Sequence, residues 1–133
     1  MNIKHVQTKD GVFFKVEDEL EITLENDYIS SALTEFDNQP PEWLINAFNR
    51  PQKHYIYFCN FGTNSLVRRK GYGRKLLQDV KRYYEGCVVY LAVGSSGEMS
   101  NTQLIEFYAS EGFKLIENDD YLYKDYPVMA IEL

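Results

Sequence analysis

Hydrophobic and polar residues alternate along the first part of the chain, which is the pattern of half-buried β-strands. Residues 3–8 and 12–18 read as two short strands on either side of Asp10-Gly11, a dipeptide typical of a hairpin turn. Residues 20–26 alternate in the same way. The pattern therefore predicts three short strands at the start of the chain.

From about residue 26 the apolar positions take helical spacing. The positions that recur every three or four residues are Tyr28, Ile29, Ala32, Leu33 and Phe36. A helix there would be capped by Asn26 or Asp27 and broken by the prolines that follow. A second short helix should begin at Pro41, where a missing backbone N–H costs nothing. Its buried face would consist of Trp43, Leu44, Ala47 and Phe48.

Two nearly continuous apolar runs, residues 54–61 and 87–93, are typical of strands that are covered on both faces. Between them, apolar residues at helical spacing predict a helix that ends near Gly86, so this region should form a βαβ crossover. Residues 102–112 predict another helix. The last two predicted strands are residues 113–117 and 127–133.

The length of 133 residues predicts a single domain, 1–133, with enough core to fold without disulfides or metals. No apolar run approaches the roughly 20 residues of a membrane span, and the first ten residues lack the apolar centre of a secretory signal. We therefore expect a cytoplasmic protein. Cys59 and Cys87 each lie in an apolar segment, which favours reduced core thiols, and the sequence predicts no metal site.

Positive charge is concentrated in one short stretch of an acidic chain. The net charge is −6, yet five of the fourteen basic residues fall within the eight positions 68–75, so the remaining residues carry −11. A chain that generally repels polyanions disfavours broad nucleic-acid binding, but one basic stretch can hold a compact phosphate ligand. We expect no membrane partner.

The basic stretch contains R-x-x-G-x-G, formed by Arg68, Gly71 and Gly73, directly before a predicted helix. The glycines allow the backbone to turn tightly, and the first N–H groups of the helix have no partner within it. A helix N-terminus beside basic side chains favours a pyrophosphate. The stretch matches neither the Walker loop nor the dinucleotide fingerprint, and by itself it fits a solvated basic turn equally well.

A second motif lies about thirty residues downstream. Residues 101–113 read N-x-x-L-x-x-F-Y-x-x-x-G-F, and with the earlier loop this resembles the GNAT family of N-acetyltransferases. The resemblance covers about residues 54–133. It implies an α/β (α+β) fold in which a mixed, mostly antiparallel sheet of six to seven strands is flanked by about four helices. It also implies an acceptor-side half, 1–53, and an acetyl-CoA-binding half, 54–133.

The resemblance implies that acetyl-CoA is the cofactor and that its pyrophosphate lies on the glycine loop, between strands that splay apart to admit the pantetheine arm. The implied cofactor-binding residues are Phe61, Thr63, Arg68, Arg69, Lys70, Gly71, Tyr72, Gly73, Arg74, Asn101 and Tyr108. A backbone N–H between Phe61 and Thr63 would hold the thioester oxygen. Asn101 would also suit a helix N-cap.

Tyr108 is the candidate catalytic residue, because a tyrosine hydroxyl can protonate the thiolate that leaves. A tyrosine at this point of an amphipathic helix is also a reasonable core residue. The general base remains open: the candidates are Glu35, Asp37, His54, Glu98 and, less favoured, His5. Trp43 could line an acceptor pocket or belong to the core.

The N-terminal half departs from the family pattern, since it predicts two or three strands before the helical pair and one after it. The acceptor is therefore open, although the acidic chain favours a cationic primary amine. We expect direct acetyl transfer in a ternary complex. The alternatives are a non-catalytic CoA-binding or protein-interaction module and, less favoured, a nucleic-acid-binding protein. The strand at 127–133 could pair across a homodimer.

Overall fold

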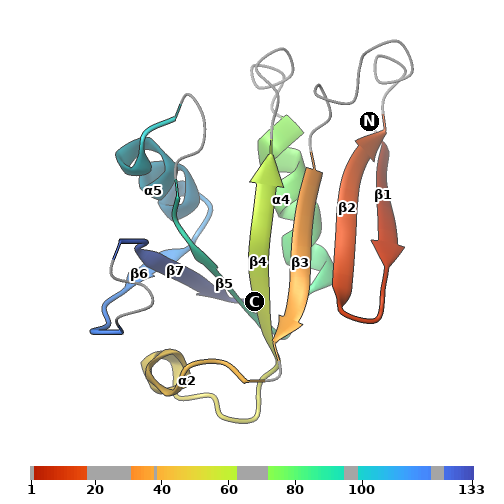
Figure 1. The fold of residues 1–133 in the computed structure, drawn as a ribbon. Coiled ribbons are helices and arrows are strands. Elements are labelled where there is room, and N and C mark those ends of the chain that lie inside the picture. The colour runs from red at the N-terminus through yellow and green to blue at the C-terminus, as the bar shows by residue number, and fades with distance from the viewer. Residues whose placement is uncertain (1, 18–30, 38, 63–71, 95–98, 121–124) are drawn as a thin grey trace. The chain divides into compact units, whose positions relative to one another are not determined.

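The computed structural model describes residues 2–17, 31–37, 39–62, 72–94, 99–120 and 125–133 (Figure 1). Three helices lie in these ranges: α2 (Glu42–Phe48), α4 (Tyr72–Tyr83) and α5 (Asn101–Ser110). The strands are β1 (Asn2–Gln7), β2 (Gly11–Glu17), β3 (Ser31–Asp37), β4 (Tyr55–Gly62), β5 (Val88–Ala92), β6 (Lys114–Ile116) and β7 (Val128–Glu132).

The strands form one seven-stranded sheet in the order β1-β2-β3-β4-β5-β7-β6. β4 and β5 are parallel over Tyr55–Tyr57 and Val88–Tyr90, and α4 is the connection between them, so the predicted βαβ crossover is confirmed. β1–β2, β2–β3, β5–β7 and β6–β7 are antiparallel. The predicted fold class, a mixed and mostly antiparallel sheet with flanking helices, is therefore confirmed.

β7 lies between β5 and β6 in the sheet and pairs with both. It does not form the edge of the sheet, which its predicted pairing across a homodimer required. Pairing through β7 as an edge strand is therefore wrong, because β6, although only three residues long, occupies the outer side of β7; a homodimer as such stays a prediction.

The chain divides into two compact units. Unit 1 consists of residues 1–36 and 58–85, and unit 2 of residues 37–57 and 86–133.

In unit 1, β1 and β2 form the predicted hairpin. Thr8 closes its turn by accepting a hydrogen bond from the Gly11 N–H at 3.2 Å. α4 packs against one face of the strands (Figure 1). The apolar face of α4 and the residue after it are fully or almost fully buried: Leu76, Leu77, Val80 and Tyr84.

Residues 31–37 form a strand, so the helix predicted to end near Phe36 is wrong in this part. β3 pairs antiparallel with β2, and the pairing places Thr34 opposite Val12. Thr34 is completely buried and its hydroxyl donates to the Val12 carbonyl oxygen at 3.1 Å, whereas Glu35 is exposed. Pairing with a distant strand therefore prevails over local helical spacing. The predicted strand 20–26 and the start of the predicted helix lie outside the described residues.

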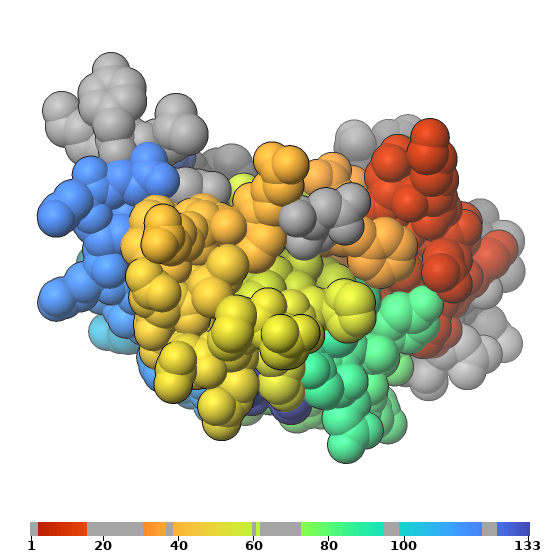
Figure 2. Space-filling model, turned by 90° about the horizontal axis from the view of Figure 1, so that it is seen from below, coloured from red at the N-terminus to blue at the C-terminus, as the bar shows by residue number. Residues whose placement is uncertain are grey.

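In unit 2, the predicted short helix is present as α2, and it begins at Glu42, one residue after the predicted start, with Pro41 as its N-cap. Leu44 is completely buried in a core formed with Tyr55, Val88, Tyr90, Ile116, Val128 and Ala130. Trp43 and Phe48 pack against this core while partly exposed, and Ala47 is exposed. The burial predicted for Ala47 is wrong, because the seven-residue helix turns it toward solvent. In Figure 2, α2 and the segment that leads to β4 form a continuous part of the surface.

The two cysteines are free thiols, as the sequence predicted, but they are half-buried and do not belong to the fully buried core. Among the described helices, none combines the length and the apolar character needed to cross a membrane.

Candidate functional site

The first turn of α4 holds the described part of the basic glycine stretch. Gly73 is buried, Arg74 and Lys75 are exposed, and this turn contains no acidic residue. Positive side chains therefore add to the partial positive charge at this helix N-terminus. Thr63, Arg68, Arg69, Lys70 and Gly71, all predicted to bind the cofactor, lie outside the described residues, and Tyr72 is described by its backbone alone.

Phe61 lies near the end of β4 in unit 1 and is half-buried. Its ring lies 5.6 Å from the ring of Phe58, measured between centroids. Unit 1 therefore contains four described residues of the predicted cofactor set: Phe61, Gly73, Arg74 and, by its backbone alone, Tyr72.

Unit 2 contains the other two described residues of that set, Asn101 and Tyr108, both on α5. Ser100 is the N-cap: its hydroxyl accepts from the Gln103 N–H at 3.2 Å, and the Gln103 side chain accepts from the Ser100 N–H at 2.9 Å. Asn101 is the first helical residue and is exposed. The prediction that Asn101 caps this helix is therefore wrong by one position, because Ser100 completes a capping box with Gln103.

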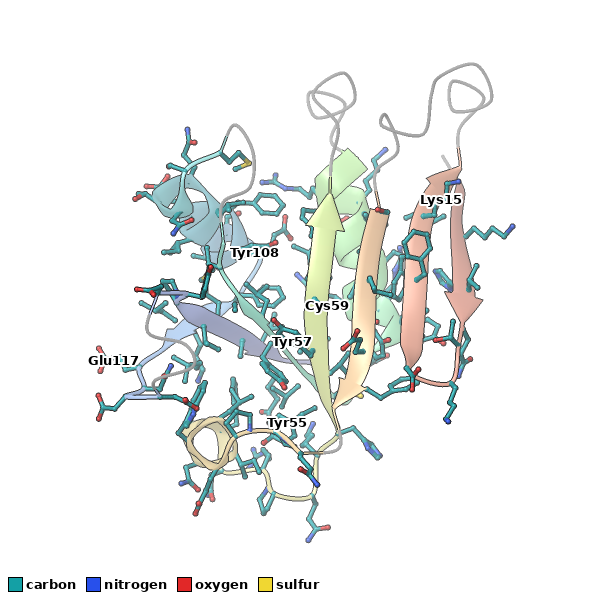
Figure 3. The ribbon with its side chains drawn as sticks, in the orientation of Figure 1. Lys15, Tyr55, Tyr57, Cys59, Tyr108 and Glu117 are labelled. Atoms are coloured by element: carbon teal, nitrogen blue, oxygen red, sulfur yellow. The ribbon has the colours of Figure 1, made fainter. Side chains whose placement is uncertain are left out.

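Tyr108 is buried, with 6% of its surface exposed. The rings of Phe107 and Phe113 pack edge-on against it, with centroids 5.4 and 5.6 Å away. Burial raises the pKa of the Tyr108 hydroxyl well above its usual 10, because the apolar surroundings disfavour the phenolate. Tyr108, whose side chain is labelled in Figure 3, is therefore protonated at neutral pH.

The candidate general bases have separate environments. Glu35 is exposed and lies beside Cys59, whose pKa is raised to about 11 by burial and by the Glu35 carboxylate. His54 is exposed, and its carbonyl oxygen accepts from the Val88 N–H at 2.9 Å. Glu98 and the side chain of Asp37 lie outside the described residues. The structure therefore favours none of these candidates.

His5 pairs with Asp79, which the sequence pattern did not mark as a candidate residue. Its Nε2 lies 2.5 Å from the Asp79 carboxylate on α4, and its ring packs edge-on against Phe14 and Tyr83. His5 and Asp79 lie 74 positions apart in the sequence, so no local spacing could have indicated their contact. His5 therefore joins β1 to α4.

Within the described ranges, no group of three or more histidine, cysteine, aspartate or glutamate residues could hold a metal ion.

A model of the acetyltransferase (GNAT) family matches residues 15–113. This match covers most of the chain, including Gly73 and Tyr108. The chain therefore belongs to the GNAT acetyltransferase family. No curated protein sequence is similar enough to count as a match.

Solved structures of acetyltransferases share the fold at low sequence identity. Naa50 of Arabidopsis thaliana, in complex with the bisubstrate analogue CoA-Ac-MVNAL, is 18% identical, with a TM-score of 0.53 over 78% of this chain and 65% of that one. A putative GNAT acetyltransferase of Bacteroides thetaiotaomicron is 19% identical, with a TM-score of 0.61 over 96% and 64%. The chain thus spans slightly less than two thirds of the length of both neighbours.

The ribosomal-protein-S18-alanine N-acetyltransferase of Escherichia coli is 19% identical, with a TM-score of 0.58 over 95% of this chain and 71% of that one. At these identities the likeness establishes the fold alone.

Proposed function

We propose that the protein is an acetyl-CoA-dependent N-acetyltransferase that moves an acetyl group directly to a primary amine. The observation that carries this proposal is Tyr108, a buried tyrosine whose hydroxyl stays protonated at neutral pH. It lies in the N-x-x-L-x-x-F-Y stretch of residues 101–108 that resembles the family's motif. Family membership supports the same chemistry. We also propose that residues 1–133 act as one domain, with the acceptor-side half at 1–53 and the cofactor half at 54–133.

The described residues of α4 fit the pyrophosphate of CoA. The first turn exposes Arg74 and Lys75, contains no carboxylate that would repel the ligand, and begins beside the buried Gly73. Free backbone N–H groups at a helix N-terminus bind phosphate oxygens well. The predicted loop residues from Arg68 to Gly71 would complete this binding. When bound, acetyl-CoA supplies the acetyl group as an activated thioester.

The reaction requires two proton movements. An ammonium with a pKa of about 10.4 is neutral in about one molecule in 2,500 at pH 7, a cost of roughly 4.6 kcal/mol, so a base or water must take a proton from the acceptor. The new C–N bond forms as the C–S bond breaks, and Tyr108 donates its proton to the departing thiolate. A backbone N–H between Phe61 and Thr63 would stabilise the negative charge on the carbonyl oxygen.

Amines at protein N-termini are the first acceptors to test. The Arabidopsis neighbour holds an analogue that joins CoA to the sequence MVNAL, and the Escherichia coli neighbour acts on an alanine of ribosomal protein S18. The net charge of −6 would also steer cationic amines toward this chain. Lysine side chains and polyamines are therefore the second group of acceptors.

The cofactor is tested by thermal shift with acetyl-CoA, CoA and ATP. A ligand at 100 times its dissociation constant should stabilise the protein by about 2.7 kcal/mol, or several degrees. We expect this shift for the wild type and its loss in the Gly71→Glu, Gly73→Glu double variant. Arg74→Glu should weaken it, whereas Arg82→Glu, with the same charge change in the last turn of α4, should keep it. No shift at saturating acetyl-CoA would contradict the proposal.

The role of Tyr108 is tested by thiol release with an amine panel. Tyr108→Phe should lower kcat by about 10²–10⁴-fold and leave the acetyl-CoA thermal shift unchanged, because the hydroxyl acts in proton transfer. Tyr126→Phe is the matched control, since Tyr126 is 52% exposed in the same unit. Binding of CoA without thiol release in the wild type, for any amine, would instead favour the non-catalytic CoA-binding module.

A further inference from the structure

The strands of unit 1 present one face that α4 does not cover. Side chains alternate between the two faces of a strand, and Phe14 points toward α4, where its ring lies 5.3 Å from Tyr83 and 6.1 Å from Tyr84. Phe13 and Lys15 therefore point to the opposite face. Within the described part of unit 1 no helix lies on that face (Figure 1).

An apolar row crosses this face from strand to strand. Val6 of β1 lies opposite Phe13 of β2, and Phe13 lies opposite Leu33 of β3. Val6 is 43% exposed, and the other two side chains are half-buried. We call this face, with its row Val6–Phe13–Leu33 and the charged residues that flank it, the open face.

Charges of opposite sign flank the apolar row. Lys4 and Lys15 pair in register with each other on one side of the apolar row. Each lies two residues from the row along its own strand. Glu35, exposed, lies on the other side, where it pairs in register with Gly11. Lys15 and Glu35 are therefore separated by four residues along the strands, about 13 Å, so they flank the row rather than pair with each other.

We propose that the open face binds the open face of a second copy of this chain, about a two-fold axis that runs along the apolar row. With this axis, Val6, Phe13 and Leu33 of one copy each face the same residue of the other copy. The Lys15 side of one open face then lies against the Glu35 side of the other. Lys15 of each copy then lies above the Gly11 position of the other copy. Glu35 of that other copy lies beside its Gly11 on the neighbouring strand, about 4.8 Å across the sheet from Gly11, where the long Lys15 side chain can reach it across the interface.

The charge arrangement selects this axis and this partner. A two-fold axis along the strands would place Lys15 against Lys15, whereas the axis along the row forms two Lys15–Glu35 pairs for each dimer. A face that complements itself needs no other protein to neutralise its charge. The described residues of the open face come from three short strands, so we expect the association to be weak and to depend on protein concentration.

The test is sedimentation velocity at low ionic strength, from about 1 μM to about 1 mM protein, on the wild type and on charge variants. Wild type should shift from monomer to dimer mass over this range. Lys15→Glu and Glu35→Lys each convert both pairs to repulsion and should weaken association by about tenfold or more. The double swap, Lys15→Glu with Glu35→Lys, should restore the dimer.

An equimolar mixture of K15E and E35K should also associate, as a heterodimer in which every pair is again of opposite sign. Glu85→Lys is the matched control, because Glu85 is exposed at the end of α4, away from the open face. Circular dichroism confirms that the variants fold. A wild type that keeps the mass of a monomer throughout, or single variants that associate as the wild type does, would overturn the proposal and leave this face to a different partner.

Discussion

Tyr84, directly after α4, and Thr34 of β3 share a hydrogen bond in the core of unit 1, although they lie fifty residues apart. Both side chains are buried. Because the Thr34 hydroxyl uses its proton on the Val12 carbonyl oxygen, Tyr84 is the donor to Thr34. One threonine therefore connects β2, β3 and the end of α4.

Replacing Thr34 should destabilise the protein more than replacing Tyr84. Thr34→Val removes the acceptor of a buried hydroxyl and should lower the free energy of unfolding by about 2 kcal/mol. Tyr84→Phe leaves Thr34 bonded to Val12 and should lower it by about 1 kcal/mol. Urea unfolding of both variants and of the double variant gives the coupling between them. Purely additive losses would show that the hydrogen bond contributes nothing to stability.

The Cys59 thiol should react slowly and with an unusual pH dependence. Burial, followed by the Glu35 carboxylate, raises its pKa to about 11, and the thiolate is the reactive form. In a Cys87→Ser background, the rate of alkylation by iodoacetamide should rise about ninefold between pH 9 and 10, against about twofold for a thiol of pKa 9. Glu35→Gln should reduce this rise. A rate that levels off near pH 9 would contradict the assigned environment.

The raised pKa of Cys59 also predicts how the stability of the protein changes with pH. Because the folded pKa lies above the unfolded value, the unfolded chain loses this proton first as the pH rises. The Cys59 contribution is therefore fully present below about pH 9 and is lost between about pH 9 and 11. Urea unfolding at pH 8 and 10 should show a smaller loss of stability for Cys59→Ser than for the wild type.

Trp43 and Asp120 connect α2 to the segment that follows β6. The indole Nε1–H donates to the Asp120 carboxylate at 3.0 Å. Asp120→Ala should lower the free energy of unfolding by about 1–2 kcal/mol, and Asp120→Asn, which keeps an acceptor oxygen, by less. Trp43 is the only tryptophan, so its fluorescence in urea reports this region directly. Equal losses for Asp120→Ala and Asp120→Asn would show that an acceptor oxygen at position 120 does not stabilise the protein through the Trp43 hydrogen bond.

Gly112 and Gly86 form a matched pair of left-handed positions, with φ of 96° and 90°. A Cβ at Gly112 would lie 3.0 Å from Cδ1 of Ile131, whereas one at Gly86 would meet no atom within 4 Å. Gly86→Ala should therefore cost about 1 kcal/mol from backbone strain alone. Gly112→Ala should cost more, because Ile131 must also move. Thermal unfolding compares them, and a smaller loss for Gly112→Ala would contradict the observed packing.

Several elements could be predicted from the sequence because their signals are local. The long apolar runs at 54–61 and 87–93 correspond to β4 and β5, and Pro41 marks the start of α2. The motif at 101–113 correctly indicated α5 with Gly112 after its end. The family resemblance, drawn from the two motifs, is confirmed by the family match.

The N-cap of α5 shows the limit of local reasoning. The sequence offers Ser100 and Asn101 as adjacent capping residues, and both types cap helices well. The capping box between Ser100 and Gln103 decided the choice. A spacing of three residues to a glutamine was visible in the sequence and would have indicated Ser100.

By itself, the sequence determined the strand and helix runs with strong periodicity, the concentration of basic charge in 68–75 and the family. Tertiary structure alone decided that residues 31–37 form a strand, since Ala32, Leu33 and Phe36 fit helical spacing until β2 supplies a partner for Thr34. It also decided that His5 meets Asp79 and that burial raises the pKa of Tyr108. Strand pairing and burial depend on interactions between residues that lie far apart in the sequence, and no local pattern contains these interactions.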